Sequence, residues 1–264
     1  MASSPIWLAR VPEALGEPTA LRRLAGGAWR FEAGGRALVA KAGPGARDEA
    51  AGLAQLAGAV GGPPVPPVVL VDDDLLVTVA VETGDRTAVA EERLGRALAR
   101  LHAGPWPTWG GGSRWVGACR VENGEHVDGA QFYGRRLSEL AARCGLEAHV
   151  SRVMDRLDRL VPAGPPALVH GDLWWGNVVW GRHDRAWLID PSTHGGHPEE
   201  DLAMLALFGA VPDGLRCAYH EVLPPVTGWR EREALFQLAP LLVHAVLFGG
   251  GYRSQAEAVA RRYG

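Results

Sequence analysis

The hydrophobic and polar positions of the first eighty residues follow the spacing of β-strands more than that of helices. Short apolar runs bounded by turn-forming residues predict three strands, at residues 37–40, 68–71 and 75–81. One helix is expected between the first two strands, because apolar residues recur at i, i+3, i+4 and i+7 from Leu53 to Val60. The stretch 61–64 ends that helix, since proline cannot continue the helical hydrogen bonds.

Beyond Thr87 the apolar residues recur every three or four positions, as on one face of a helix. Such helices are expected at 94–101, 133–144 and 150–160, with a Gly- and Trp-rich loop at 105–124. Short strands are then expected at 167–170, 177–180 and 186–190. The remainder is predicted to be helical from the acidic residues 199–201 onward, since a helix N-terminus favours negative charge.

This order of elements predicts an α+β protein built as two lobes. Residues 1–82 are expected to form a small β-rich N-lobe and residues 83–264 a larger, mainly helical C-lobe, with a hinge near residues 81–84. With 264 residues the chain is long enough to bury a sizeable core and to leave a cleft between the lobes.

Charge and composition exclude several classes of partner. A formal charge of -3 gives no electrostatic reason to expect nucleic acid or an anionic membrane as partner. The longest uncharged stretch, 234–252, contains a proline and three glycines, which indicates a buried helix rather than a membrane span. Residues 1–10 lack the layout of a signal peptide, and the three cysteines are too scattered for a disulfide framework or a zinc site. We therefore expect a cytoplasmic protein.

The strongest chemical signal is an aspartate, Asp172, followed five positions later by Asn177 and then by Asp190 at the end of the next predicted hairpin. Phosphoryl transfer from ATP requires such a set. One carboxylate accepts or orients the proton of the acceptor hydroxyl, while the asparagine and the second carboxylate hold Mg²⁺ against the phosphate oxygens. Each residue alone would be explained equally well by a turn or a strand end, so the prediction depends on all three in order.

Lys41 is the only lysine among the 27 basic residues. It ends a predicted strand, and Glu49 opens the helix that follows, as in phosphoryl-transfer enzymes where a helix glutamate holds the phosphate-binding lysine. The alternatives are a solvated surface lysine and a pairing with Asp48 instead. Gly26 and Gly27, after a short helix-like segment, lie where a nucleotide-covering loop would fall, although a hairpin turn explains them equally well.

Trp174, two residues after Asp172, is a candidate platform for a sugar ring, because aromatic faces pack against apolar C–H surfaces. Packing inside the core is the alternative. Histidines at 170, 183, 194 and 197 raise the question of a metal site, but two glycines between the last two indicate a loop rather than a rigid ligand-bearing helix. We expect His170 to brace the loop that carries Asp172.

Several segments together resemble one family. They are Lys41 with 49–53, 132–137, 170–177, 188–191, 195–197, 201–204, 207–209 and 242–252. In this combination the chain resembles the fructosamine kinase (ketosamine-3-kinase) family, within the aminoglycoside phosphotransferase-like, protein-kinase-like group. The resemblance covers nearly the whole chain, and the Gly-Gly-His and C-terminal Phe-Gly-Gly-Gly-Tyr segments narrow it to this family.

The resemblance implies a protein-kinase-like two-lobe fold and ATP- and Mg²⁺-dependent phosphorylation of a sugar hydroxyl on ketosamines, which form by glycation of amines. The residues implied are Asp172 as catalytic base, Asn177 and Asp190 as Mg²⁺ ligands, and Lys41 with Glu49 as the phosphate-binding pair. Gly26 and Gly27 belong to the nucleotide-covering loop in this assignment. Trp174 and His197 are assigned to the substrate site.

The chain departs from the family pattern in a shortened nucleotide-covering loop at 26–32 and in the loop 109–123, which bear on ATP closure and on the sugar substrate. The nearest alternative is a kinase for another small alcohol or an aminoglycoside, whose positive charges would require carboxylates such as those at 199–201. A catalytically silent nucleotide-binding protein is the alternative from another class. The sequence does not define the ketose, the amine, free metabolite versus glycated protein, or the oligomeric state.

Overall fold

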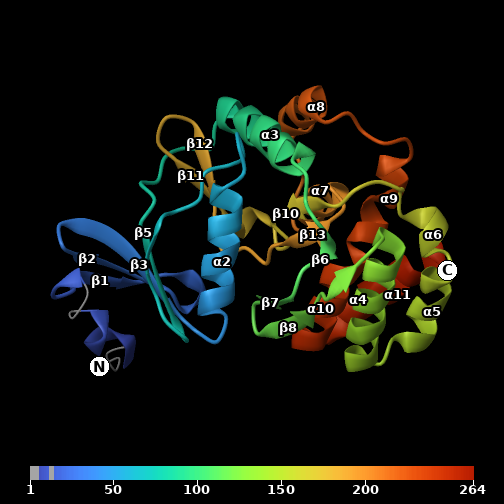
Figure 1. The fold of residues 1–264 in the computed structure, drawn as a ribbon, viewed down its shortest axis with the longest axis horizontal. Coiled ribbons are helices and arrows are strands. Elements are labelled where there is room, and N and C mark those ends of the chain that lie inside the picture. The colour runs from blue at the N-terminus through green and yellow to red at the C-terminus, as the bar shows by residue number, and fades with distance from the viewer. Residues whose placement is uncertain (1–5, 12–14) are drawn as a thin grey trace.

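The structure, a computed structural model, describes residues 6–11 and 15–264. Part of the segment 1–10, in which the sequence shows no signal-peptide layout, therefore lies outside the described residues. Figure 1 shows a β-rich N-terminal part beside a larger helical C-terminal part. The expected α+β arrangement is confirmed, while the division of the chain at residues 82 and 83 stays a prediction.

Five antiparallel strands form the N-terminal sheet in the order β1-β2-β3-β5-β4. Their bounds are Thr19–Arg23, Trp29–Ala33, Arg36–Ala42, Val68–Val71 and Leu75–Val79 for β1 to β5. Gly34 and Gly35 join β2 to β3, and their φ angles of 56° and 72° form the two-residue turn that suits the twist of paired strands. Phe31 and Leu38 are fully buried on one face of this sheet. On the other face, α2 (Ala46–Ala57) packs through Leu53 in the same cluster as Leu76.

The C-terminal part contains helices α3 to α11 (Figure 1). Their bounds are Ala88–Ala103, Gly129–Cys144, Glu147–Met154, Leu157–Leu160, Glu199–Leu207, Asp213–Val222, Trp229–Phe236, Leu238–Phe248 and Gly250–Tyr263. The sequence supplies side-chain caps for two of them, since Thr87 accepts a backbone hydrogen bond at the start of α3 and Asp128 does so at α4.

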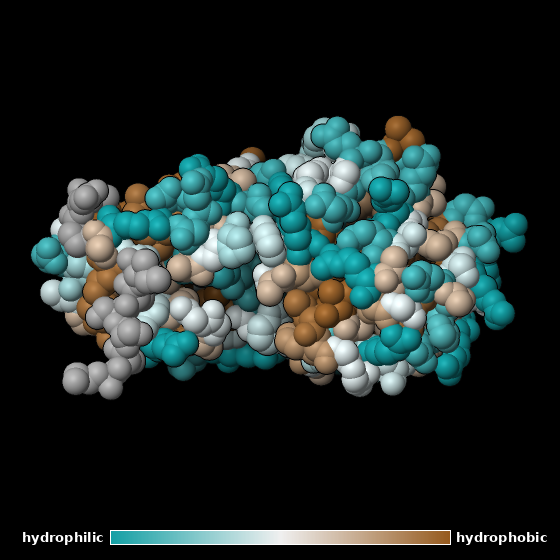
Figure 2. All heavy atoms as spheres, turned by 90° about the horizontal axis from the view of Figure 1, so that it is seen from below, coloured by the Kyte–Doolittle hydropathy of each residue, from teal (hydrophilic) through white to brown (hydrophobic). Residues whose placement is uncertain are grey.

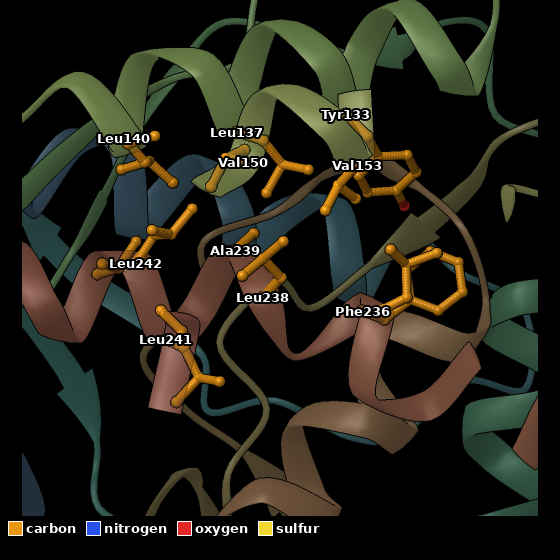
Figure 3. Close-up of a cluster of buried hydrophobic side chains, with 14 of the residues drawn as sticks. Tyr133, Leu137, Leu140, Val150, Val153, Phe236, Leu238, Ala239, Leu241 and Leu242 are labelled. Atoms are coloured by element: carbon orange, nitrogen blue, oxygen red, sulfur yellow. The ribbon is translucent and has the colours of Figure 1, made fainter. Parts of the chain in front are cut away.

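The main C-terminal core forms where α4 and α5 face α10. In Figure 3 Leu137 and Leu140 of α4 point toward Leu238 and Leu242 of α10. Leu140, Leu238 and Leu242 have no exposed surface, and burying one leucine side chain stabilises a fold by about 1.5–3 kcal/mol. This core fixes the helices on which the surrounding loops are mounted.

The stretch 105–124, expected to be a loop, instead forms short strands. They are β6 (Trp109–Gly110), β7 (Ser113–Val116) and β8 (Cys119–Glu122), followed by β9 (Glu125–His126). In β8 the residues are alternately buried and exposed, as in a strand with one face on a core. The prediction of a loop was wrong because the glycines of this stretch concealed that two-residue period.

Three further strands agree with the sequence, and a fourth was missed. β10 (Ala167–Val169), β11 (Val178–Gly181) and β12 (Arg185–Leu188) are confirmed, whereas β13 (His194–Gly196) carries no apolar signal. β13 pairs with β10 and with β6, so its main chain is enclosed on both sides. A β-carbon on Gly195 would lie 1.9 Å from the oxygen of Thr108, which explains why glycine occupies this buried strand.

Three local predictions are corrected by the structure. The helix expected at 150–160 is two helices, α5 and α6, which are separated at Asp155 and Arg156. Val60 lies beyond the end of α2 and is 94% exposed, so it is not part of the apolar stripe. The helix-like segment before Gly26 is the strand β1.

The surface is mostly polar. Figure 2 shows one face that is largely hydrophilic, with its most compact hydrophobic patch near the middle. Within residues 6–11 and 15–264, no helix has both the length and the apolar character needed to cross a bilayer.

Candidate active site

The loop 170–177 connects β10 to β11 and folds back on itself through Asn177. The side-chain amide of Asn177 donates to the main-chain oxygen of Asp172 at 2.8 Å, and more weakly, at 3.4 Å, to its carboxylate. The backbone N–H of Asn177 also bonds to the oxygen of Trp174. Because the amide nitrogen of Asn177 is used inside the loop, its carbonyl oxygen is the atom that remains for a metal ion.

Asp190 reaches the same place from the end of β12 by an uncommon backbone conformation. Its φ of 55° lies in the left-handed region, which costs a non-glycine residue about 1 kcal/mol. The N–H of Ile189 donates to the oxygen of Asn177 at 3.1 Å, so one main-chain hydrogen bond joins Asn177 to the residue that precedes Asp190. Strain of this kind is characteristic of side chains held at a functional site.

Lys41 connects the two lobes at this point. Its ammonium lies 2.7 Å from the carboxylate of Glu49 on α2 and 2.9 Å from that of Asp190. Burial disfavours the charged ammonium, but the two carboxylates outweigh this effect and raise the pKa of Lys41 above its ordinary value. Glu49, rather than the neighbouring Asp48, is the helix residue in this contact.

The site holds more negative than positive charge. Burial, followed by the nearby carboxylate of Asp190, raises the pKa of Asp172 to about 7 and that of Glu49 to about 7. A carboxyl group with such a pKa can accept or release a proton near neutral pH. The same excess of negative charge is what a bound cation would neutralise.

The donor atoms present fit Mg²⁺ better than a softer metal. Asn177 and Asp190 offer oxygen atoms, and Mg²⁺ takes one or two carboxylates from a protein and its other ligands from phosphates and water. Across the described part of the chain, no group of three or more His, Cys, Asp or Glu side chains is placed to hold a metal ion. A complete protein cage for a transition metal is therefore absent from this part, whereas a shared magnesium–phosphate site is compatible with it.

Asp201 holds the loop in place from beneath, a role that the sequence did not reveal. It lies in the first turn of α7 as expected, but only 1% of it is exposed. Its two carboxylate oxygens accept the backbone N–H groups of His170 and Gly171 at 2.8 and 3.0 Å. His102 of α3 lies 3.1 Å from the same carboxylate. A helix start explained its place in an acidic run, and its place in the segment 201–204 contributed only to the family resemblance.

His170 braces the same end of the loop through its own side chain. One ring nitrogen bonds to the main-chain oxygen of Ile189 at 2.9 Å, and the other accepts the N–H of Asp172 at 3.3 Å. Burial lowers the pKa of His170, so the ring is neutral and can donate on one side and accept on the other. His170 thereby connects the segment of Asp172 to that of Asp190.

Gly26 and Gly27 form the turn between β1 and β2. Their φ angles of 66° and 80° are readily adopted by glycine, and no atom lies within 4 Å of a β-carbon added to either. The glycines are therefore needed for the backbone conformation and not for close packing. Among the described residues, no backbone hydrogen bond joins this turn to the loop 170–177.

Trp174 is part of this loop, and 42% of its surface is exposed. Its ring meets that of Phe208 edge-on, with the ring centres 6.2 Å apart. The ring centres of Phe208 and His244 are 5.1 Å apart. Phe248 and Tyr252 extend this row of rings, which we call the aromatic wall. The sequence indicated Trp174 alone, because the other members come from segments far along the chain.

His197 is not brought to this cluster by any contact found in the structure. Its ring stacks on Phe236 at 4.9 Å, and its backbone N–H bonds to Tyr133 and Glu200. Only 7% of the residue is exposed, and burial lowers its pKa to about 4. It also lines a separate cleft of about 100 Å³ together with Leu202. Its surroundings are those of a packed histidine.

Two sequence comparisons agree on the family. The family model described as fructosamine kinase matches residues 42–263. A candidate ketoamine kinase of Synechocystis is 34% identical over 179 residues, covering 64% of this chain and 61% of that protein. The protein-ribulosamine 3-kinase of Arabidopsis thaliana is 31% identical over 195 residues, covering 68% of this chain and 58% of that protein. The matched part thus spans less than two thirds of either relative.

Solved structures extend the similarity to nearly the whole chain. A candidate fructosamine-3-kinase from Thermobifida fusca is 38% identical and superposes with a TM-score of 0.89 over 99% of both chains. The choline kinase LicA of Streptococcus pneumoniae is 16% identical with a TM-score of 0.68, covers 98% of this chain and 97% of its own, and shares the fold. The expected protein-kinase-like fold is confirmed. On these matches, the chain belongs to the fructosamine kinase family.

Proposed function

We propose that the protein is a kinase that uses ATP and Mg²⁺ to phosphorylate a sugar hydroxyl of small ketosamines of the fructosamine or ribulosamine type. The observation that carries this proposal is the meeting of Lys41 with Glu49 and Asp190 across the two lobes. Relatives named ketosamine-3-kinase in mouse and protein-ribulosamine 3-kinase in Arabidopsis support the acceptor. Two proteins of the same fold have been solved with AMP or ADP bound, which supports the nucleotide.

Asp172 is the base of the proposed reaction. It accepts the proton of the acceptor hydroxyl while that oxygen attacks the γ-phosphate in line. Its pKa of about 7 suits proton transfer near neutral pH, and the hydrogen bond from Asn177 to its main chain fixes its direction. Phosphoryl transfer requires little covalent participation by the protein, so positioning and charge provide most of the acceleration.

Lys41 is proposed to bind the α- and β-phosphates, with Glu49 holding its ammonium in place. Asn177 and Asp190 would hold Mg²⁺, which neutralises charge on the phosphate oxygens. On nucleotide binding, Lys41 exchanges part of its contact with Asp190 for the phosphates. Gly26 and Gly27 are proposed to cover the nucleotide from the tip of the β1–β2 hairpin, where their main chain can approach closely.

The acceptor is proposed to bind against Trp174. Trp174 is partly exposed and follows Asp172 by two positions in the sequence. The C–H surfaces of a sugar ring pack well on aromatic faces. The aromatic wall beyond Trp174 offers a surface for the amine substituent, because aromatic rings also attract ammonium groups. The contacts of His197 do not support a direct role in this subsite, so its assignment there is not part of the proposal.

A polycationic aminoglycoside acceptor is disfavoured, because the carboxylates at the start of α7 that could bind it already have partners within the protein. Glu199 pairs with Arg232 at 2.6 Å, and Glu200 bonds to Tyr133 and His194. Asp201 is occupied by the backbone of the loop 170–177. All three side chains are thus engaged within the protein and are not available to bind several ammonium groups.

The three cysteines are free thiols, which supports a reducing, cytoplasmic setting.

Phosphate transfer to a panel of acceptors tests the proposal. The panel contains fructosyl-lysine, ribulosyl-lysine, choline and an aminoglycoside, each supplied with ATP and Mg²⁺ while ADP release is followed. We expect turnover on at least one ketosamine and none on the aminoglycoside, with no turnover in the presence of EDTA. Transfer to the aminoglycoside or choline but to neither ketosamine would contradict the proposed acceptor.

A further inference from the structure

The hairpin of β7 and β8 is anchored in the C-terminal lobe. Cys119 and Val121 of β8 are 1% and 0% exposed and belong to the core shared with α4 and α10. Trp115 of β7 lies opposite Arg120 in the strand pairing. Because β8 is fixed in the core and β7 is paired to it, the position of Trp115 is fixed relative to the C-terminal lobe.

Trp115 contacts the N-terminal lobe. A β-carbon placed on Gly45 would lie 3.1 Å from both Cβ and Cδ1 of Trp115. The lack of a side chain at Gly45 therefore lets the indole approach the main chain where α2 begins. Figure 1 shows β7 and β8 beside the N-terminal end of α2.

The contact at Gly45 is one helical turn from the phosphate-binding pair. The carbonyl of Gly45 accepts the N–H of Glu49 at 2.8 Å, and the carboxylate of Glu49 binds Lys41 at 2.7 Å. A shift of Gly45 would therefore move Glu49 through a single hydrogen bond, and Lys41 through the next.

The C-terminal half of α2 rests on the loop that follows Asp190. Thr193 donates to Gln55 at 2.5 Å, and a β-carbon on Gly52 would lie 3.1 Å from the ring of Pro191. Glu49 thus lies between two contacts of the same helix with the C-terminal lobe, one at Gly45 and the other at residues 52–55. The orientation of α2 depends on both.

From this arrangement we infer that Trp115 is a positioning residue, whose contact with Gly45 places Glu49 and, through it, Lys41 against the nucleotide phosphates. The inference rests on the proposed function and gives a task to the segment 109–123, where the chain departs from the family pattern. The hairpin therefore couples the C-terminal lobe to the phosphate-binding side of the site.

Replacing Trp115 tests the inference in steady-state kinetics. In Trp115→Ala we expect kcat/KM for ATP to fall about tenfold, since small misplacements of a positioning group are costly. The KM for the ketosamine should stay within about twofold of the wild-type value. Trp115→Phe should keep most of the wild-type kcat/KM for ATP. Glu125→Gln, at an exposed position on the next strand β9, is the control and should leave all parameters unchanged. A loss confined to the ketosamine KM overturns the inference.

A double-mutant cycle with Glu49→Gln separates positioning from a general loss of stability. If Trp115 acts through Glu49, adding Trp115→Ala to Glu49→Gln lowers nucleotide affinity no further. Losses that multiply instead show an independent effect and overturn the inference. Should Trp115→Ala not fold, Trp115→Leu replaces it with the same expected outcome, because leucine fills space without the reach of the indole.

Nucleotide affinity is measured by titration with a fluorescent ATP analogue and Mg²⁺, without an acceptor. A wild-type protein that binds the analogue but phosphorylates no ketosamine would contradict the proposed acceptor and still allow the cycle to be completed. Unchanged affinity in folded Trp115→Ala, beside a weakened Glu49→Gln, would overturn the role of Trp115 alone.

Discussion

Burial and the negative charge of Asp190 act on the pKa of Asp172 in the same direction. Both disfavour its ionised form, so its pKa rises to about 7, while the hydrogen bond from Asn177 partly opposes the rise. Lys41 provides the nearby positive charge, and it is already bound to Glu49 and Asp190. The carboxyl group of Asp172 is therefore poised for proton transfer by its surroundings as much as by its own chemistry.

Asp172→Asn removes the base and preserves the size of the side chain. We expect phosphate transfer to fall at least about 100-fold, the usual contribution of a general base, while ATP affinity changes little. ADP release and nucleotide titration measure the two effects separately. Asp158→Asn, at an exposed position on α6, is the control. A fully active Asp172→Asn protein would contradict the assignment of the base.

His197 gives a prediction about stability rather than activity. Burial lowers its pKa to about 4, compared with 6.5 in an unfolded chain. Between these values the unfolded state binds a proton that the folded state does not, so the free energy of unfolding decreases as the pH falls from 6.5 toward 4. The decrease from this one group is at most about 3 kcal/mol.

Urea unfolding of the wild type and of His197→Gln at pH 7 and pH 5 measures this effect. The variant is less stable at pH 7, because it loses the stacking on Phe236, but it should lose less stability on acidification. His149→Gln on α5 is the control. Between pH 7 and pH 5 it should lose as much stability as the wild type. Equal losses in wild type and His197→Gln would show that His197 takes up its proton in the folded state.

The first turn of α7 anchors the catalytic loop as well as starting a helix. Asp201 accepts two backbone hydrogen bonds from the loop and lies beside His102, so this helix end and α3 together fix where Asp172 lies. In Asp201→Asn one of the two oxygens becomes an NH₂ group, which cannot accept a backbone N–H. A loop held by one hydrogen bond instead of two allows Asp172 to move.

For Asp201→Asn we therefore expect kcat to fall by about tenfold or more through misplacement of Asp172. Breaking the buried contact with His102 should also cost about 3 kcal/mol of stability. Steady-state kinetics at a temperature where the variant is folded, together with thermal unfolding, distinguish the two effects. Asp213→Asn in the first turn of α8 is exposed and serves as the control. Lower stability with an unchanged kcat would limit Asp201 to a structural role.

Periodic elements were predictable, whereas elements defined by their partners were not. The helices α3 and α4 and the strands β3 and β5 follow from apolar spacing, which reports one buried face. β13 consists of a histidine and two glycines, and it is a strand only because β6 and β10 bond to it on both sides. A pattern within one segment carries no information about such neighbours.

The predicted site shows the same limit. Asp172, Asn177 and Asp190 could be grouped from their order and spacing, and Lys41 with Glu49 from a strand followed by a helix. The inward turn of Asp201 could not be predicted, because a carboxylate at a helix start has the same sequence signal whether it faces water or the catalytic loop. The contact of Trp115 with Gly45 joins positions seventy residues apart and depends wholly on tertiary packing.

The two lobes meet through charges that a nucleotide would rearrange. Lys41 belongs to the sheet of the N-terminal lobe, and Asp190 to the C-terminal lobe, so their 2.9 Å contact spans the boundary. The packing of α2 on the loop after Asp190 spans it as well. Ligands that bind at this boundary contact both lobes at once and stabilise the folded chain as a whole.

This coupling leads to a prediction for Asp190→Asn, in which the carboxylate proposed to bind Mg²⁺ is lost. A ligand present at a hundred times its Kd stabilises a protein by about 2.7 kcal/mol, which for a chain of this size raises Tm by roughly 5–10 °C. We expect ATP with Mg²⁺ to produce such a shift in the wild type and EDTA to remove most of it, as measured by thermal unfolding. In Asp190→Asn the shift should be small with or without EDTA.

Asp184→Asn, in the turn between β11 and β12 and bound to Thr87 rather than to the site, should respond like the wild type. A full, EDTA-sensitive shift in Asp190→Asn would show that the metal is held by other groups.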